Sequence, residues 1–230
     1  MRVEIRDLWK RYPGTWALRG VSLTVETGRV LGVLGENGCG KSTFFRILSG
    51  LTRPSKGTIS LDGLPVGVET KRRVAFLPEV DSFYDWMRVM EQLEFLSAFY
   101  PGWDIEKSRE LLNFMELPEG QKIGTLSRGQ KGRLKVVAAF SWPSDLVLMD
   151  EPFAGIDPPS RRRILQGLFN EFRFDAQTMF LTSHLVTEIE AFIEDLVFMK
   201  AGEIVLSGNM DQVREEQGKS LEEIFETVAY

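Results

Sequence analysis

A run of eight residues, 35–42, has the residue types and the spacing of a loop that binds phosphate groups. The run reads G-E-N-G-C-G-K-S, follows the apolar residues 30–34, and precedes the helix-like residues 43–48. Small residues let the backbone N–H groups turn toward an anion, and the N-terminus of the next helix adds a positive field. Lys41 would attract the terminal phosphates, and the hydroxyl of Ser42 is an oxygen ligand suited to Mg²⁺. The order of strand, loop and helix therefore predicts a site for a nucleoside triphosphate. Its residues are Gly35, Glu36, Asn37, Gly38, Cys39, Gly40, Lys41, Ser42 and Thr43.

Two adjacent carboxylates follow another apolar run, residues 146–149. Asp150, at the end of a buried strand beside the loop, could hold the hydrated Mg²⁺. Glu151 could orient and deprotonate a water molecule aimed at the γ-phosphorus. An acidic turn after a strand is the simpler alternative, but the phosphate loop in the same chain favours the chemical roles.

The composition limits the class of protein. Of the 230 residues, 43% are hydrophobic and 27% are charged, as in an ordinary soluble globular protein with one sizeable core. The net charge of −5 argues against binding to nucleic acid, because domains that bind it are usually basic over one face. The single cysteine, Cys39, excludes an internal disulfide and favours a cytosolic setting. No run of about 18 apolar residues predicts a membrane span.

Strand patterns lie at both ends of the chain, and helical patterns lie between them. Alternating apolar residues near the N-terminus predict strands on either side of a turn at residues 12–14. Residues 87–140 have helical periodicity, with Asp104 as an N-cap, and Asp157 opens a further helix. Further short strands are predicted at residues 58–61, 74–77, 146–149, 179–181, 196–199 and 204–206.

These patterns predict an α/β fold. Strands on either side of a helical stretch imply a core interrupted by an inserted helical subdomain. The phosphate loop resembles that of P-loop NTPases, and this resemblance implies a core with a mixed β-sheet and an N-terminal antiparallel β subdomain. The whole chain, 1–230, would form a single domain, with its core at 1–79 and 141–230 and the helical subdomain at about 80–140.

The residues 126–130, L-S-R-G-Q, resemble the L-S-G-G-Q signature of ABC ATPases, with Arg128 in place of the first glycine. Ser127 and Gln130 by themselves predict a capping box at the start of a helix. A plain capped helix would explain these two residues but not the ordered set of motifs. The resemblance covers essentially the entire chain. It implies that Ser127, Arg128, Gly129 and Gln130 cover the γ-phosphate of a nucleotide bound to a partner subunit.

The same resemblance assigns roles to residues elsewhere in the chain. Tyr12 lies where the family places an aromatic ring under adenine, although a tyrosine packed on the core is a strong alternative. Asp157 closes a segment that resembles the loop crossing the dimer interface. His184, the only histidine, resembles the residue that contacts the γ-phosphate. With Lys41 on the phosphates and Glu151 as general base, these residues would form the catalytic site.

Three positions depart from the family pattern. Glu79 stands where the family usually has a glutamine that contacts Mg²⁺ and the attacking water. A carboxylate could ligate Mg²⁺ together with Ser42 and Asp150, but it cannot donate a hydrogen bond when ionised. The guanidinium of Arg128 could face solvent or a neighbouring carboxylate. Cys39 replaces a residue that is often alanine, and we expect it to contribute only its backbone N–H.

The resemblance implies an ATP-binding and ATP-hydrolysing subunit of an ABC transporter, with ATP and Mg²⁺ as cofactors. The subunit would form a homodimer or pseudo-homodimer around ATP and drive a separate transmembrane permease subunit at the inner face of the cell membrane. Export fits better than import. Phe83, Tyr84 and Trp86 would either pack in the core or contact the permease. The alternative is a soluble ABC ATPase in an assembly or scaffolding system.

Overall fold

The computed structural model describes residues 1–80, 82–173, 176–184 and 186–229, and the chain divides into two compact units. Unit 1 comprises Met1–Phe76, Asp145–Glu151 and Phe174–Tyr230. Unit 2 comprises Leu77–Ser144 and Pro152–Arg173. The residues predicted to form a helical subdomain, about 80–140, fall in unit 2, which also takes in a helix after residue 151. The proposed domain boundaries stay a prediction.

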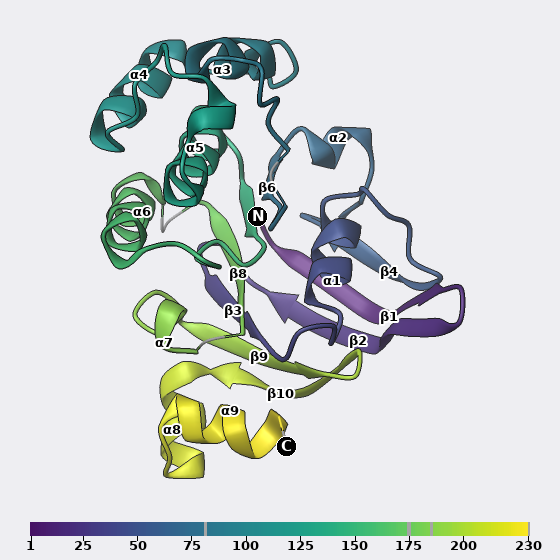
Figure 1. Ribbon diagram of the computed structural model, residues 1–230. Coiled ribbons are helices and arrows are strands. Elements are labelled where there is room, and N and C mark those ends of the chain that lie inside the picture. The colour runs from purple at the N-terminus through teal and green to yellow at the C-terminus, as the bar shows by residue number, and fades with distance from the viewer. Residues whose placement is uncertain (81, 174–175, 185, 230) are drawn as a thin grey trace. The chain divides into compact units, whose positions relative to one another are not determined.

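A mixed sheet of six strands runs in the order β10-β9-β3-β8-β7-β6 (Figure 1). β3 pairs in parallel with β8 and β9, β7 pairs in parallel with β8, and β10 is antiparallel to β9. Every residue of β3, β7 and β8 is buried, as the continuous apolar runs of parallel strands predict. The strands are β3 (Val30–Leu34), β6 (Val74–Leu77), β7 (Leu146–Met149), β8 (Thr178–Ser183), β9 (Asp195–Lys200) and β10 (Glu203–Asn209).

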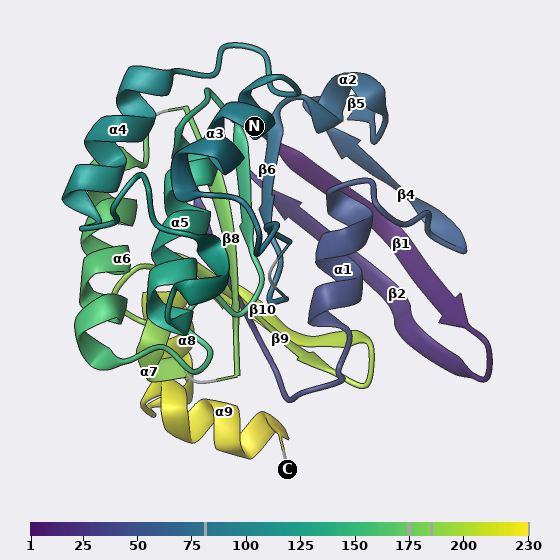
Figure 2. The same ribbon diagram turned by 45° about the horizontal axis from the view of Figure 1, so that its top comes forward.

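Near the N-terminus an antiparallel sheet in unit 1 has the order β2-β1-β4-β5. Its strands are β1 (Val3–Tyr12), β2 (Thr15–Val25), β4 (Lys56–Leu61) and β5 (Leu64–Pro65), and a short helix, α2 (Val68–Lys71), follows. α1 (Lys41–Leu48) lies beside β1 and β2 (Figure 2). Phe44 and Phe45 of α1 are buried in a core that also contains Leu8 of β1 and Phe180 of β8. The predicted mixed sheet and antiparallel N-terminal sheet are confirmed.

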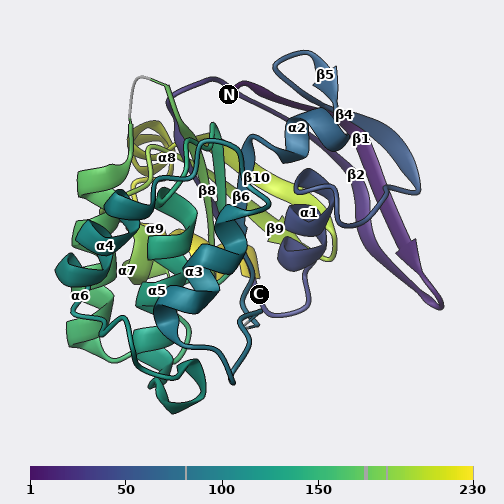
Figure 3. The ribbon, with the colours of Figure 1, turned by 90° about the horizontal axis from the view of Figure 1, so that it is seen from above.

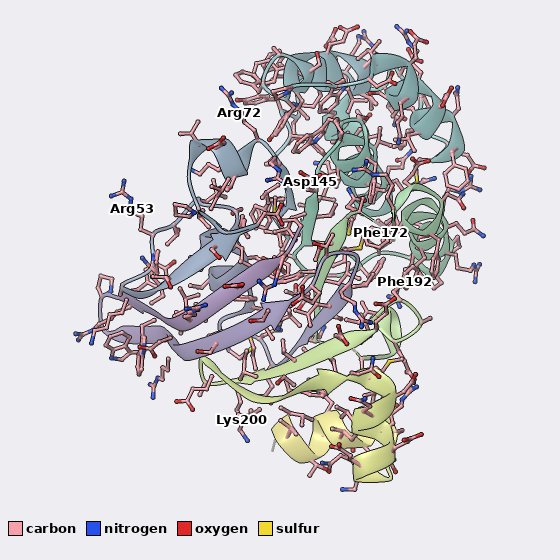
Figure 4. All side chains as sticks on the ribbon, turned by 180° about the vertical axis from the view of Figure 1, so that it is seen from behind. Arg53, Arg72, Asp145, Phe172, Phe192 and Lys200 are labelled. Atoms are coloured by element: carbon pink, nitrogen blue, oxygen red, sulfur yellow. The ribbon has the colours of Figure 1, made fainter. Side chains whose placement is uncertain are left out.

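Three further helices in unit 1 are α7 (Val186–Ile189), α8 (Met210–Gln217) and α9 (Leu221–Ala229). The last two were not predicted from the sequence. α9 packs on β9, where the rings of Phe225 and Phe198 have centroids 5.7 Å apart. Lys200 lies at the end of β9 (Figure 4). Its ammonium group donates a hydrogen bond to the carbonyl of Val228 at 3.0 Å. At the start of β7, the carboxylate of Asp145 accepts a 2.6 Å hydrogen bond from Arg73.

Unit 2 is helical in the parts that the structure describes. Its elements are α3 (Val89–Ser97), α4 (Ile105–Phe114), the 3₁₀ turn Ile123–Thr125, α5 (Arg128–Phe140) and α6 (Pro158–Glu171). α5 packs against α3, α4 and α6 (Figure 3). The predicted caps are confirmed: the Asp104 carboxylate accepts from the Lys107 amide, and the Asp157 carboxylate accepts from the Ser160 amide, each at 2.9 Å. Among the described residues, no helix is long and apolar enough to cross a membrane.

Candidate functional site

The predicted phosphate loop connects β3 to α1 in unit 1, and close backbone contacts require glycine at positions 35 and 40. Gly35 has φ 154° and Gly40 has φ 117°, conformations that side chains with a Cβ rarely adopt. A Cβ at Gly35 would collide with the carbonyl of Met199, and one at Gly40 would collide with the carbonyl of Ala17. Backbone therefore packs behind the loop, and the predicted order of strand, loop and helix is confirmed.

The Lys41 side chain is buried, and its ammonium group is held by oxygen atoms of the protein. Nζ donates hydrogen bonds to the carbonyls of Gly35 at 2.6 Å and Glu36 at 3.1 Å. It also lies 3.4 Å from Oε1 of Glu151. The lysine therefore spans from the phosphate loop to the end of β7, and a bound phosphate would compete with the protein oxygens for its ammonium group.

Glu151 has a backbone conformation that is unusual for a residue with a side chain. It follows β7, it is 8% exposed, and its φ is 46°. Residues other than glycine rarely adopt this left-handed region, and such residues cluster at functional sites. The carboxylate oxygen Oε1 is buried and accepts no hydrogen bond. This oxygen therefore has an unfilled acceptor position that a hydrogen-bond donor such as water could fill.

His184 lies against the other oxygen of the same carboxylate. Its Nδ1 is 2.8 Å from Glu151 Oε2, and its side chain is 36% exposed. The parallel pairing of β7 with β8 brings the ends of the two strands together, since Met149 pairs with Leu181. Lys41 and His184 therefore contact opposite oxygens of the Glu151 carboxylate. The sequence predicted these three residues but not their mutual contacts.

Thr182 also contacts the acidic pair, and no sequence motif predicted this residue. Its hydroxyl lies between the Asp150 carboxylate, at 2.9 Å, and the Glu151 backbone N–H, at 2.7 Å. A threonine two residues before a histidine carries no signal by itself. Only the pairing of β8 with β7 shows that this hydroxyl faces the two acids.

The residues proposed to hold Mg²⁺ in unit 1 are Ser42 and Asp150. No group of three or more His, Cys, Asp or Glu side chains in the described chain could hold a metal ion by itself. Proteins usually bind Mg²⁺ through one or two carboxylates plus the phosphates of a substrate, rather than in a cage made only of protein. Asp150 is 4% exposed, with one carboxylate oxygen bonded to Thr182. One buried carboxylate and one hydroxyl beside a phosphate loop therefore fit Mg²⁺.

The remaining predicted nucleotide-binding residues differ in their surroundings. Glu36 and Asn37 are exposed on the loop. The Cys39 side chain is buried in the core, and burial raises the pKa of its thiol, while its carbonyl accepts from the Gly202 amide at 2.9 Å. Tyr12 is 38% exposed, and the ammonium of Lys10 lies 4.9 Å from the centre of its ring. Stacking of this ring on adenine stays a prediction.

In unit 2 the signature segment forms the predicted capping box. The Ser127 amide donates to Gln130 Oε1 at 2.9 Å, and the Gln130 amide donates to Ser127 Oγ at 3.2 Å. A Cβ at Gly129 would lie 2.6 Å from both Asp157 Oδ1 and Ser160 Oγ. Glycine at 129 thus allows the start of α5 to approach the start of α6. The structure brings the signature segment and Asp157 together.

Arg128 pairs with no carboxylate in the described part of the chain. Its guanidinium lies against Gly155, which has φ 67° and no room for a Cβ. Glu79 is exposed, and its carbonyl and that of Pro78 each accept from Lys135 Nζ at 2.9 Å. The loop after β6 is therefore tied to α5, and the metal role of the Glu79 carboxylate stays a prediction.

An exposed aromatic cluster in unit 2 extends the predicted trio of residues 83, 84 and 86 onto α3. The exposed fractions are 46% for Tyr84, 68% for Trp86, 39% for Phe95 and 62% for Phe99. The ring centroid of Tyr84 lies 5.7 Å from that of Trp86 and 5.7 Å from that of Phe95. The ring centroids of Phe95 and Phe99 are 5.1 Å apart. Tyr84 and Trp86 are therefore not core residues of unit 2. Phe83 is half-buried.

Comparisons with known proteins agree on one family. The family model described as ABC transporter matches residues 18–154. The ABC transporter ATP-binding protein YtrB of Bacillus subtilis (strain 168) is 32% identical over 216 residues, which cover 93% of this chain and 74% of the relative. The Nod factor export ATP-binding protein I of Burkholderia orbicola (strain AU 1054) is 32% identical over 215 residues, which cover 90% of this chain and 70% of the relative. A solved structure of an ATP-binding subunit of an ABC transporter has a TM-score of 0.89 at 27% identity and covers 100% of both chains.

Proposed function

The chain belongs to the ABC transporter family of ATP-binding proteins, and we propose that it binds ATP with Mg²⁺ and hydrolyses the ATP to ADP and phosphate. One observation carries this proposal: the buried carboxylate of Glu151 lies between Lys41 and His184 at the end of β7. An acid fixed beside the lysine of a phosphate loop is placed to act on a water molecule next to the terminal phosphate.

Binding would begin with an exchange of partners at Lys41. The phosphate oxygens attract the ammonium group more strongly than the carbonyls of Gly35 and Glu36, because they carry negative charge. The loop amides would hold the phosphates from the other side. Asp150 and Ser42 would hold Mg²⁺, which when bound neutralises charge on the phosphate oxygens.

Glu151 would then accept the proton of the attacking water. Once Lys41 moves toward the phosphates, Oε1 of Glu151 has neither a hydrogen bond nor an ion pair. His184 holds Oε2 at 2.8 Å and so fixes the orientation of the carboxylate. As the water oxygen bonds to the γ-phosphorus, the bond from that phosphorus to the bridging oxygen breaks, and ADP leaves. The second ring nitrogen of His184 is the atom available to the phosphate.

Phosphate release by the purified chain tests this proposal. We expect ATP hydrolysis by the wild type and loss of ATP binding in Lys41→Ala, because the ammonium group is removed from the loop. Lys56→Ala is a matched control, since Lys56 is an exposed lysine on β4. The proposed nucleotide site would be wrong if the wild type bound no ATP, or if Lys41→Ala bound ATP with unchanged affinity.

We also propose that two copies close around ATP. Support comes from the start of α5, where the partial positive charge of a helix N-terminus lies in the signature segment. Glu151→Gln protein with ATP should sediment as a dimer, and adding Ser127→Arg should return it to a monomer. Ser97→Arg, at the C-terminal end of α3, should leave the dimer intact. A dimer of unchanged stability without nucleotide would contradict this proposal.

A transmembrane subunit is the partner that we propose for the exposed aromatic cluster of unit 2. Contiguous exposed apolar side chains commonly mark a protein-binding surface. If a neighbouring gene encodes a membrane protein that co-purifies with this chain, the double change of Tyr84 and Trp86 to serine should abolish that co-purification. Phe169→Ser, which alters an exposed ring on α6, should not. Co-purification that survives the double change would remove the cluster from this interface.

We propose attachment to the cytoplasmic face of the cell membrane through that subunit, and export as the direction of transport. Support for export comes from the name of one relative, which assigns it to the export of Nod factor. Membrane fractionation of cells tests the attachment. Recovery of the chain in the soluble fraction, with no membrane protein bound, would favour the alternative of a soluble assembly ATPase.

A further inference from the structure

Thr182 is completely buried at the point where the ends of β7 and β8 meet. Its hydroxyl donates a hydrogen bond to Asp150 Oδ1 at 2.9 Å and accepts one from the Glu151 N–H at 2.7 Å. A hydroxyl has a single hydrogen, so donation to Asp150 and acceptance from Glu151 fix its orientation. One side chain thus connects the two adjacent acids proposed for different roles.

The bond to Glu151 holds a backbone conformation that the residue would not adopt by preference. With φ 46°, Glu151 is in the left-handed region, where a Cβ crowds the backbone. Surrounding contacts must hold such a conformation in place. The Thr182 hydroxyl binds the amide of this residue, whose side chain reaches Lys41 and His184.

The bond to Asp150 limits how that carboxylate can turn. With Oδ1 bonded to Thr182, the other oxygen remains as the one that can serve Mg²⁺. Hydrogen bonds to a metal-binding carboxylate typically set its orientation, and losing them weakens metal binding. Valine at position 182 would fill the same space, but it would leave both Asp150 Oδ1 and the Glu151 N–H without this partner.

We infer that Thr182 is a positioning residue that sets both Mg²⁺-dependent ATP binding, through Asp150, and the rate of hydrolysis, through Glu151. The inference rests on the proposed ATPase function. It differs from a purely structural role in one respect: ATP binding in the absence of Mg²⁺ stays unchanged when the hydroxyl is removed, because the phosphate loop and Lys41 remain intact.

The test compares Thr182→Val and Thr182→Ser with Thr178→Val. Thr178 is a matched control because it is equally buried on the same strand, and its hydroxyl donates to the Met1 carbonyl and accepts from the Gly28 amide. A fluorescent ATP analogue gives the affinity with Mg²⁺ and with EDTA, all in the Glu151→Gln background to prevent turnover. Single-turnover phosphate release is measured with Glu151 present.

For Thr182→Val we expect the Mg²⁺-dependent gain in affinity and the hydrolysis rate each to fall by about tenfold or more. In EDTA, the affinity of this variant for the ATP analogue should stay within about twofold of that of the Glu151→Gln protein with Thr182 intact. Thr182→Ser should restore both quantities, and Thr178→Val should lower the melting temperature without changing either. If Thr182→Val does not fold, Thr182→Cys replaces it, because a thiol is a weak donor and acceptor of similar size.

Two results would overturn the inference: full Mg²⁺-dependent affinity in the variant that lacks the hydroxyl, or an equal loss in Thr178→Val. Absence of hydrolysis by the wild type would instead reject the proposed ATPase function. The Mg²⁺-dependent binding measurement would still report on Thr182 in that case.

Discussion

Replacing Glu151 by glutamine should tighten the binding of ATP to the isolated chain. The Lys41 ammonium is 3.4 Å from the Glu151 carboxylate and also bonds two loop carbonyls. ATP must draw Lys41 away from that negative charge. The change to glutamine keeps the size of the side chain and removes the charge, so the competition for Lys41 weakens. It also removes the repulsion between the carboxylate and the triphosphate.

The expected size of the effect follows from the distance. Two unit charges 3.4 Å apart attract by about 5 kcal/mol at an effective dielectric constant of about 20. Most of this is offset, because the buried pair lost its hydration when it formed and the phosphates must lose theirs. If one fifth of this attraction remains, the free energies of ATP binding to the wild type and to Glu151→Gln differ by about 1 kcal/mol. This corresponds to roughly fivefold in the dissociation constant.

Titration with a fluorescent ATP analogue in EDTA measures this effect without hydrolysis. Glu194→Gln is the control, because Glu194 is also ion-paired, to Arg29 at 3.1 Å, but lies at the surface. We expect tighter binding for Glu151→Gln and no change for Glu194→Gln. Equal or weaker binding by Glu151→Gln would show that Glu151 does not compete with ATP for Lys41.

Cys39 should react slowly with N-ethylmaleimide at pH 7.5 in the native protein and rapidly in urea, because burial raises the pKa of its thiol and keeps it protonated; fast native labelling would contradict this. Glu79→Gln should retain much of the ATPase activity but shift its Mg²⁺ requirement, and no response in either quantity would remove the metal role. The Ser160 amide lowers the pKa of Asp157, so the stability from this cap is present above the unfolded pKa and is lost as the pH falls through the lower, folded value. The difference in melting temperature between wild type and Asp157→Ala should therefore become smaller below about pH 4. A difference that does not change with pH would show that the charge of the Asp157 carboxylate does not contribute to stability.

Features that depend on local sequence were predicted correctly. The loop between β3 and α1 and the capping box at Ser127 each involve residues within about one helical turn, where glycine spacing and side-chain caps decide the structure. The parallel strands were found because they are continuous apolar runs. α8 and α9 were missed, although Asn209 is a regular N-cap for α8.

Contacts between distant segments could not be predicted in the same way. The hydrogen bonds of Thr182 to Asp150 and Glu151 depend on the register of two strands about 30 residues apart, which no local pattern specifies. The approach of Arg128 to Gly155 likewise requires the packing of α5 on α6. In both cases the sequence gives the residue types, and tertiary structure decides the neighbours.

We propose that Glu151 is the general base for ATP hydrolysis. The most direct test of this proposal is single-turnover phosphate release at saturating ATP and Mg²⁺, with the wild type and Glu151→Gln compared in the same assay. We predict a fall of about 100-fold or more in the rate, with ATP still fully bound by the variant. A rate for Glu151→Gln within a few fold of the wild type would contradict the claim.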